Sequence, residues 1–210
     1  MPDSRSALIV VDIQNDFLPG GALAVPSGDS VIDPASRLMA DPRWGAVVVT
    51  QDWHPSDHVS FAAQHENYSP FQEIELSYGP QVLWPVHCVA GSAGAALPAS
   101  LSDRTAHLVI RKGMNREVDS YSAFVEADGV TRTGLAGYLR ERGIDRVVIC
   151  GLALDFCVRF TAEDAARAGF GTAIVEDACA AISPEANEAL FAQLAAMGIT
   201  RVMTDDVLRD

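Results

Sequence analysis

The amino-acid sequence predicts an α/β protein, a three-layer α/β/α sandwich around a six-stranded parallel sheet. Six short runs of β-branched and aliphatic residues are typical of strands that are buried on both faces. Segments with helical spacing separate most of these runs, and the repeated strand-helix-strand order favours right-handed parallel crossovers. The 210 residues contain no internal repeat or linker, so we expect a single domain over residues 1–210.

The elements follow a regular order except in the middle of the chain. Strands are predicted at residues 7–11, 46–50, 107–111, 146–150, 172–176 and 200–204. Helices are predicted at 34–41, 132–142, 156–168 and 185–197, and three of them end at glycines: Gly143, Gly169 and Gly198. The last helix begins with Ser183 as N-cap and Pro184 in its first position. Residues 52–106, with a short helix predicted near 92–100, form the kind of long irregular connection that is usually functional.

The composition excludes two classes of partner. The net charge is −13 and no cluster of Lys or Arg could neutralise successive phosphates, so we expect no nucleic acid. The longest apolar runs are far too short to cross a bilayer, and the N-terminus lacks a signal-peptide pattern, which predicts no membrane association and a cytoplasmic location. The four cysteines form no CxxC pair and are expected to be reduced thiols.

Chemically reactive side chains follow four of the predicted strands. Asp12 follows the first strand, Asp52 and His54 follow the second, and Lys112 follows the third. Cys157 lies beyond the fourth strand, at the start of a helix. Because ligands bind outside the carboxyl ends of parallel strands, we expect these side chains to meet at one edge of the sheet.

Cys157 is the candidate nucleophile. Its place at a helix N-terminus and a nearby ammonium favour the thiolate, and the alternative is a small buried hydrophobe, which is our interpretation of Cys150 and Cys179. Asp12 would act as a general base that takes the thiol proton and hands it to a leaving amine, or would only cap a turn. Lys112 is the one lysine beside fourteen arginines, which is either chance or a requirement for a compact ammonium.

The segment "DWHPSDHVSF" at residues 52–61 holds two of the five histidines and predicts a metal site. Asp52 and His54 are two residues apart on an extended segment, so both side chains point the same way and could bind one divalent ion, unless they form a surface turn. His87 is the candidate third ligand. Whether His58 is a fourth ligand, a neighbour of the ligands or a loop residue stays open.

Five segments together resemble the nicotinamidases, also called pyrazinamidases, of the isochorismatase-like cysteine hydrolases: "VVDIQNDFLPGGAL", "DWHPSDHVSF", "LWPVHCVAGSAGAAL", "RKGMNREVDSYSAF" and "CGLALDFCV". The resemblance extends from about residue 7 to residue 204, and the second and third segments distinguish nicotinamidases from metal-free relatives. It implies an isochorismatase-like hydrolase fold for the predicted sandwich. It also implies a catalytic triad of Asp12, Lys112 and Cys157 and a metal site of Asp52, His54 and His87.

The resemblance further implies the remaining parts of the site. A cis peptide bond is expected between Leu152 and Ala153, and the backbone N–H groups of Ala153 and Cys157 are expected to form an oxyanion hole. Three aromatic residues match positions at which the family packs rings against the substrate: Phe17, Trp84 and Tyr121. The alternative interpretation is that these residues belong to the ordinary hydrophobic core.

The implied activity is hydrolysis of nicotinamide, and of pyrazinamide, to the acid and ammonia through a cysteine thioester, in NAD salvage. One divalent ion would orient the pyridine ring, and two imidazoles with a carboxylate suit zinc first, then iron or manganese. The expected partner is the small-molecule substrate, and a homo-oligomer is compatible with the sequence. Three alternatives stay open: a related hydrolase of another small amide or ureido substrate, a nucleotide-binding module, and a non-catalytic thiol or metal-binding protein. The nucleotide-binding alternative lacks a GxGxxG segment after the first strand.

Overall fold

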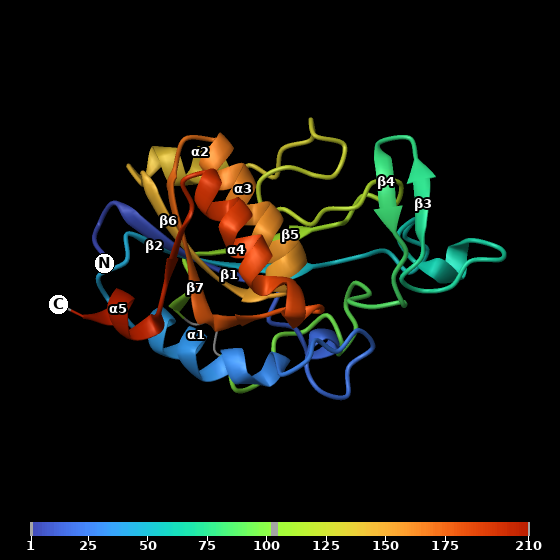
Figure 1. Ribbon diagram of the computed structural model, residues 1–210, viewed down its shortest axis with the longest axis horizontal. Helices are drawn as coiled ribbons and strands as arrows, with labels where there is room; N and C mark the ends of the chain where they lie inside the picture. Colours follow the sequence, from blue (N-terminus) through green and yellow to red (C-terminus); the bar gives the residue numbers. More distant parts are fainter. Residues whose placement is uncertain (1, 102–104, 210) are drawn as a thin grey trace.

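A six-stranded sheet lies at the centre of the computed structural model, which describes residues 2–101 and 105–209 (Figure 1). Its strands are β1 (Ser6–Val11), β2 (Ala46–Asp52), β5 (Leu108–Lys112), β6 (Arg146–Leu152), β7 (Gly171–Ala180) and β8 (Thr200–Val202). All neighbouring pairs are parallel, in the order β5-β2-β1-β6-β7-β8. Each of the six predicted strands is therefore confirmed, although the ends of several shift.

Helices cover both faces of this sheet. They are α1 (Ile32–Met39), α2 (Leu135–Glu141), α3 (Arg159–Arg167), α4 (Asn187–Ala196) and α5 (Thr204–Leu208). Helices α2, α3 and α4 lie on one face, and α1 and α5 lie on the other (Figure 1), which confirms the three-layer sandwich. The first four correspond to the predicted helices, whereas α5 was not predicted. Within the described part of the chain, no helix has the length and hydropathy needed to cross a bilayer.

The helix ends are only partly as predicted. Ser183 precedes a short 3-10 turn (Pro184–Ala186), and its side chain makes no capping hydrogen bond. The backbone N–H of Ser183 instead donates to Asp155 Oδ2 at 2.8 Å, so a carboxylate from the helical turn after β6 holds the start of this helix. The glycines predicted at helix ends do adopt left-handed backbone conformations, as expected for Gly143, Gly169 and Gly198.

Side chains of the sheet alternate between two hydrophobic cores. Leu8 and Val10 of β1 belong to the core on the side of α1, and Ala7 and Ile9 belong to the core under α2, α3 and α4. Every residue of β1 is buried, as expected for a central parallel strand covered on both faces. Burial of each such large aliphatic side chain stabilises the fold by about 1.5–3 kcal/mol. The central strands are therefore a rigid support for residues at their carboxyl ends.

The long connection between β2 and β5 contains a hairpin that the sequence did not predict. Strands β3 (Glu73–Leu76) and β4 (Gly79–Val82) pair antiparallel and project away from the main sheet (Figure 1). The prediction of a short helix near 92–100 is wrong, because this stretch forms successive turns. Gly91 precedes it with a left-handed φ of 79°, and Pro98 interrupts it, so helical hydrogen bonding has little room to develop.

The order of the sheet reverses direction at β1. The chain passes from β1 to β2 and later to β5 on one side, and then places β6 on the other side of β1. The register sets Asp52 opposite Lys112 and Val11 opposite Gly151. The carboxyl ends of these four strands therefore meet at a topological switch point, which is where open parallel sheets bind ligands.

Candidate active site

The Lys112 ammonium is the centre of the site. Its Nζ lies 2.8 Å from Asp12 Oδ2 and 3.4 Å from Cys157 Sγ, and the residue is 2% exposed. Nζ also donates to the Ser120 carbonyl at 2.8 Å and to Asp52 Oδ1. Burial alone would lower the pKa of Lys112, but Asp12 and Asp52 raise it well above its ordinary value, so the amine is charged. The structure thus brings the three predicted triad residues into contact.

Asp12 lies directly after β1 with a φ of 48°, a left-handed conformation that Asp tolerates better than most residues. Thr50 Oγ1 donates a hydrogen bond to Asp12 Oδ1 at 2.6 Å, and the Asp12 backbone N–H donates to the same hydroxyl at 3.1 Å. Burial raises the pKa of Asp12, and Lys112 only partly opposes this rise. A carboxyl group with a raised pKa suits repeated proton transfer near neutral pH.

Cys157 lies in a single π-helical turn (Leu154–Val158) that precedes α3, and it is buried. Burial raises the pKa of the Cys157 thiol, and Lys112 opposes this without overcoming it. The expectation that the helix start would favour the thiolate is therefore wrong, because desolvation dominates and α3 begins only at Arg159. The thiol needs a group that accepts its proton, and a carboxylate oxygen of Asp12 lies within 4.8 Å of the sulfur.

Asp52, His54 and His87 form a compact buried cluster. Asp52 Oδ2 lies 3.7 Å from His54 Nε2 and 3.9 Å from His87 Nε2. The Nδ1 atoms of the two histidines contact the Gly113 and Pro85 carbonyls, at 2.9 and 2.8 Å respectively. Because a carbonyl only accepts hydrogen bonds, each Nδ1 carries a proton, so the lone pair of each neutral imidazole is on Nε2, the atom nearer the carboxylate. This donor set fits a divalent ion such as zinc.

The protonation states of the cluster also suit a cation. Burial would raise the pKa of Asp52, but Lys112, His54 and His87 lower it below its ordinary value. Burial, with a contribution from His54, lowers the pKa of His87 to about 4. Burial would lower the pKa of His54 as well, but Asp52 raises it. An ionised Asp52 and a neutral His87 are in the forms that bind metal, and a bound cation would displace any extra proton from His54.

Gly113 makes room for the His54 ring. Its φ is 66°, and a Cβ atom there would lie 2.4 Å from His54 Cε1. Any side chain at Gly113 would therefore displace the ring that the Gly113 carbonyl holds. Because Gly113 directly follows Lys112, the strand that positions the lysine also positions a predicted metal ligand.

His58 lies outside the three-residue cluster. Its Nδ1 contacts Ser60 Oγ at 2.7 Å, and its ring packs 4.3 Å from the ring of His54. Its nearest group of possible ligand atoms contains His54 and Asp119 and does not include Asp52. The geometry places His58 as a neighbour of the predicted ligands, which favours one of the three interpretations that the sequence left open.

A small cavity of about 30 Å³ lies beside the triad and the cluster. The Trp84 indole N–H donates to Tyr121 Oη at 3.0 Å across its wall. The peptide bond between Leu152 and Ala153 is cis, as the resemblance implies. The predicted aromatic and oxyanion-hole residues all line the cavity, namely Phe17, Trp84, Tyr121, Ala153 and Cys157. The cavity therefore combines an aromatic wall with the polar groups of the cluster.

The sequence interpretation missed part of the cavity wall. Asp119 is 2% exposed, and its carboxylate accepts hydrogen bonds from the Ser120 N–H and from Gln81 Nε2, both at 2.8 Å. Its only signal in the sequence is its position close to Tyr121 in "RKGMNREVDSYSAF". The other missed residues are apolar: Leu23, Val25 and Ile182, which lie in loops, and Phe156, which lies in the π-helical turn beside Cys157.

Comparison with known proteins assigns the family. A model of the isochorismatase domain matches residues 6–206. The chain therefore belongs to the isochorismatase family, which excludes the nucleotide-binding alternative.

Similar proteins narrow the class further. A nicotinamidase of Acinetobacter baylyi is 50% identical over 98% of this chain and 95% of its own length. The structure of an Acinetobacter baumanii nicotinamidase and pyrazinamidase is 49% identical, covers 98% of this chain and 99% of that one, and has a TM-score of 0.94. A zinc complex of Pyrococcus horikoshii pyrazinamidase is 37% identical, covers 95% and 99% of the two chains, and has a TM-score of 0.78. These similarities confirm the resemblance to nicotinamidases and identify the chain as an amidohydrolase.

Proposed function

We propose that this amidohydrolase converts nicotinamide to nicotinate and ammonia through a thioester on Cys157, and that it also accepts pyrazinamide. The observation that carries the proposal is the buried Lys112 ammonium, which contacts Asp12, Cys157 and the predicted metal ligand Asp52 at once. The high identity to named nicotinamidases supports the choice of substrate. The reaction would serve NAD salvage in the cytoplasm.

Cys157 begins the proposed reaction by attacking the carboxamide carbon. Asp12 accepts the thiol proton, and the Lys112 charge stabilises the thiolate as it forms. As the C–S bond forms, the carbonyl electrons move to oxygen, where the backbone N–H groups of Ala153 and Cys157 would stabilise the negative charge. The intermediate then breaks its C–N bond, and Asp12 returns the proton to the departing ammonia.

A water molecule completes the proposed cycle. Asp12 removes a proton from this water as its oxygen attacks the thioester carbon. The C–S bond breaks, Asp12 passes the proton it took from water to the sulfur, and the acid product loses its remaining carboxyl proton to solvent as it leaves as nicotinate. The raised pKa of the Cys157 thiol favours this last protonation, so the resting enzyme holds a neutral nucleophile.

Asp52, His54 and His87 are the residues that would hold a divalent ion. When bound, such an ion would take the ring nitrogen and orient the pyridine so that the carboxamide faces Cys157. Asp52 uses its two oxygens for different purposes, because Oδ1 accepts from Lys112 while Oδ2 faces the histidines. Asp52 thereby keeps the triad and the ligand cluster at a constant spacing.

Ammonia release tests the proposed function directly. The purified protein should release ammonia from nicotinamide, lose this activity after chelation, and regain it with zinc, iron or manganese, because the cluster is needed to orient the ring. Metal content would be measured on the same samples. A metal-replete protein that leaves nicotinamide intact but hydrolyses another small amide would contradict the substrate and support the related-hydrolase alternative.

Two histidine variants test which side chains bind metal. His87→Asn should weaken zinc binding by more than about 100-fold, whereas His58→Asn should weaken it by less than about 10-fold, because it removes only a packing neighbour. Competition with a chromophoric chelator measures both affinities without substrate. Equal losses in the two variants would place His58 among the ligands.

A further inference from the structure

Gln81 occupies the single buried position of the β3–β4 hairpin. The other seven of the eight strand residues are exposed or half-buried, whereas Gln81 is 1% exposed. A buried amide must satisfy its hydrogen-bonding groups inside the protein, and an aliphatic side chain would have no such requirement. The presence of Gln at this position therefore indicates that its side-chain amide is required for hydrogen bonding.

Both polar atoms of the Gln81 amide have partners. Oε1 accepts a hydrogen bond from the Tyr78 hydroxyl at 3.0 Å. Nε2 lies 2.8 Å from Asp119 Oδ2 and 3.0 Å from Tyr121 Oη, and it also donates to the Val82 carbonyl at 2.7 Å. Because a carboxylate only accepts hydrogen bonds, the nitrogen of the amide must face Asp119, and the Tyr78 hydroxyl stabilises this orientation.

The segment formed by Asp119, Ser120 and Tyr121 is held from two directions. Gln81 binds the side chains of its first and last residues, and Lys112 Nζ donates to the carbonyl of Ser120 at 2.8 Å. The side chains of Asp119 and Tyr121 line the catalytic cavity. A shift of this segment would therefore move the cavity wall and one anchor of the Lys112 ammonium together.

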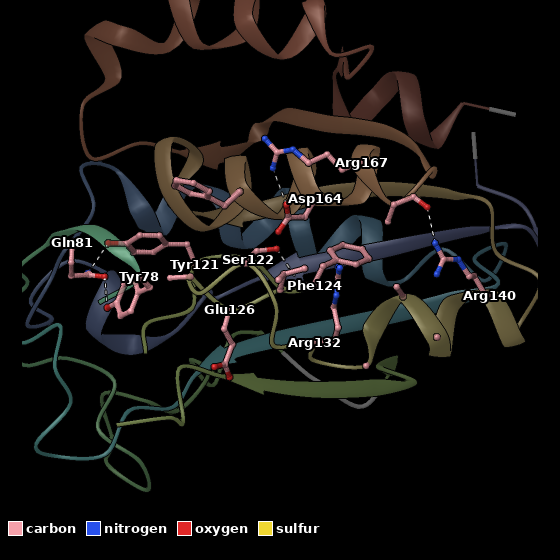
Figure 2. A pocket seen from close by; sticks show the side chains of 18 of the residues that line it. Tyr78, Gln81, Tyr121, Ser122, Phe124, Glu126, Arg132, Arg140, Asp164 and Arg167 are labelled. Carbon is pink, nitrogen blue, oxygen red and sulfur yellow. Dashed lines mark hydrogen bonds and ion pairs between the residues drawn. The ribbon is translucent and has the colours of Figure 1, made fainter. Parts of the chain in front are cut away.

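We propose that Gln81 is a positioning residue that holds this three-residue segment where the cavity and Lys112 require it. The inference rests on the proposed function. Tyr78, Gln81 and Tyr121 lie together at one end of a larger cavity of about 810 Å³ (Figure 2). Tyr121 lines both this larger cavity and the catalytic one, so the hydrogen-bond network also separates the catalytic cavity from solvent in the larger cavity.

Gln81→Met tests the proposal because it keeps the side-chain length and removes every hydrogen bond of the amide. We expect kcat/KM for nicotinamide to fall about tenfold, the size of effect expected for a lost hydrogen bond to a carboxylate. KM should rise because the Tyr121 side chain in the cavity wall is less well held. The value of kcat should fall because the Ser120 carbonyl, which accepts a hydrogen bond from Lys112, shifts. Tyr78→Phe is a milder comparison variant. It removes the donor to Oε1 and a long hydrogen bond of 3.4 Å from the Asp119 N–H, but it keeps every contact of Gln81 Nε2, so it should retain kcat/KM within about threefold.

Thiol alkylation distinguishes a local effect of Gln81 on the catalytic cavity from a general loosening of the fold. Iodoacetamide should modify Cys157 about tenfold faster in Gln81→Met than in the wild type, because the network no longer closes the cavity. Cys179 is partly buried, lies outside the cavity wall and should react at an unchanged rate. Mass spectrometry of the two peptides measures both rates. Faster modification of both cysteines, or an unchanged kcat/KM, would overturn the proposal.

A second variant and the wild type distinguish failure of the Gln81 proposal from misfolding and from failure of the proposed function. Gln81→Glu retains the acceptor for Tyr78 but cannot donate to Asp119 when ionised, so it should show the same loss if Gln81→Met does not fold. Wild-type kcat/KM in a folded Gln81→Glu variant would overturn the proposal. A wild-type protein that is inert towards nicotinamide would instead contradict the proposed function, and the alkylation rates would then decide the role of Gln81.

Discussion

Cys157→Ala is expected to abolish ammonia release from nicotinamide, with kcat falling by at least about 10⁴-fold. The thiol is the group that would form the covalent intermediate, and it lies 3.4 Å from the Lys112 ammonium and beside Asp12. Without the thiol, Asp12 would have to activate water for direct attack on the amide, with no thioester intermediate to divide the reaction into two easier steps. Ammonia release by the metal-loaded variant measures the effect.

The controls for this variant separate chemistry from folding. Cys150→Ala removes another buried thiol, which lies inside β6 and away from the cavity, and should retain full kcat. Cys157→Ala should bind zinc as tightly as the wild type, because Asp52, His54 and His87 remain in place. Measurable turnover by the folded, metal-loaded variant would exclude Cys157 as the nucleophile.

Lys112→Arg should lower kcat/KM by about 100-fold or more although it preserves the positive charge. The Lys112 ammonium is a compact donor with Asp12, Asp52 and the Ser120 carbonyl around it in a fully buried space. A planar guanidinium is larger and cannot place one nitrogen among all of these acceptors. Steady-state kinetics with nicotinamide gives the measurement.

Arg111→Lys is the matched control for the lysine variant. Arg111 precedes Lys112 on β5, and its exposed guanidinium lies 3.7 Å from the centre of the Trp53 ring. Exchanging Arg for Lys there should leave kcat/KM within about threefold, because only a surface cation–π contact changes. Full activity in Lys112→Arg would show that the solitary lysine is a coincidence.

The sheet and the edge that carries the site could be predicted because their signals are local. Continuous β-branched runs identify buried parallel strands, and glycines identify helix ends. Once the strands are parallel, the residues that follow them must share one edge. This is why the meeting of Asp12, Asp52, Lys112 and Cys157 could be expected before any coordinates.

Features that depend on distant contacts could not be predicted. Strand β3 reads EIEL and alternates between exposed and half-buried residues, but a run of four residues is too short to identify a strand, and its partner β4 begins with Gly79 and Pro80, which are unfavourable in strands. Asp119 lines the cavity, and its carboxylate accepts a hydrogen bond from Gln81 of the β3–β4 hairpin, a contact between segments that are distant in the sequence. The raised pKa of Cys157 comes from burial, which no local pattern encodes and which outweighs the opposing effect of the Lys112 charge.

Because β1 lies between β2 and β6 in the sheet, the site at its carboxyl end is complete only after the later strand β6 has paired with it. β1 pairs with β2 on one side and with β6 on the other, and β6 ends shortly before Cys157. A growing polypeptide therefore contains Lys112 and all three predicted metal ligands well before its nucleophile has been synthesised. Pairings between strands so far apart in the chain carry a high contact order and slow the folding reaction. Recovery of ammonia release after dilution from denaturant would accordingly report the docking of β6 onto β1, rather than collapse of the N-terminal half.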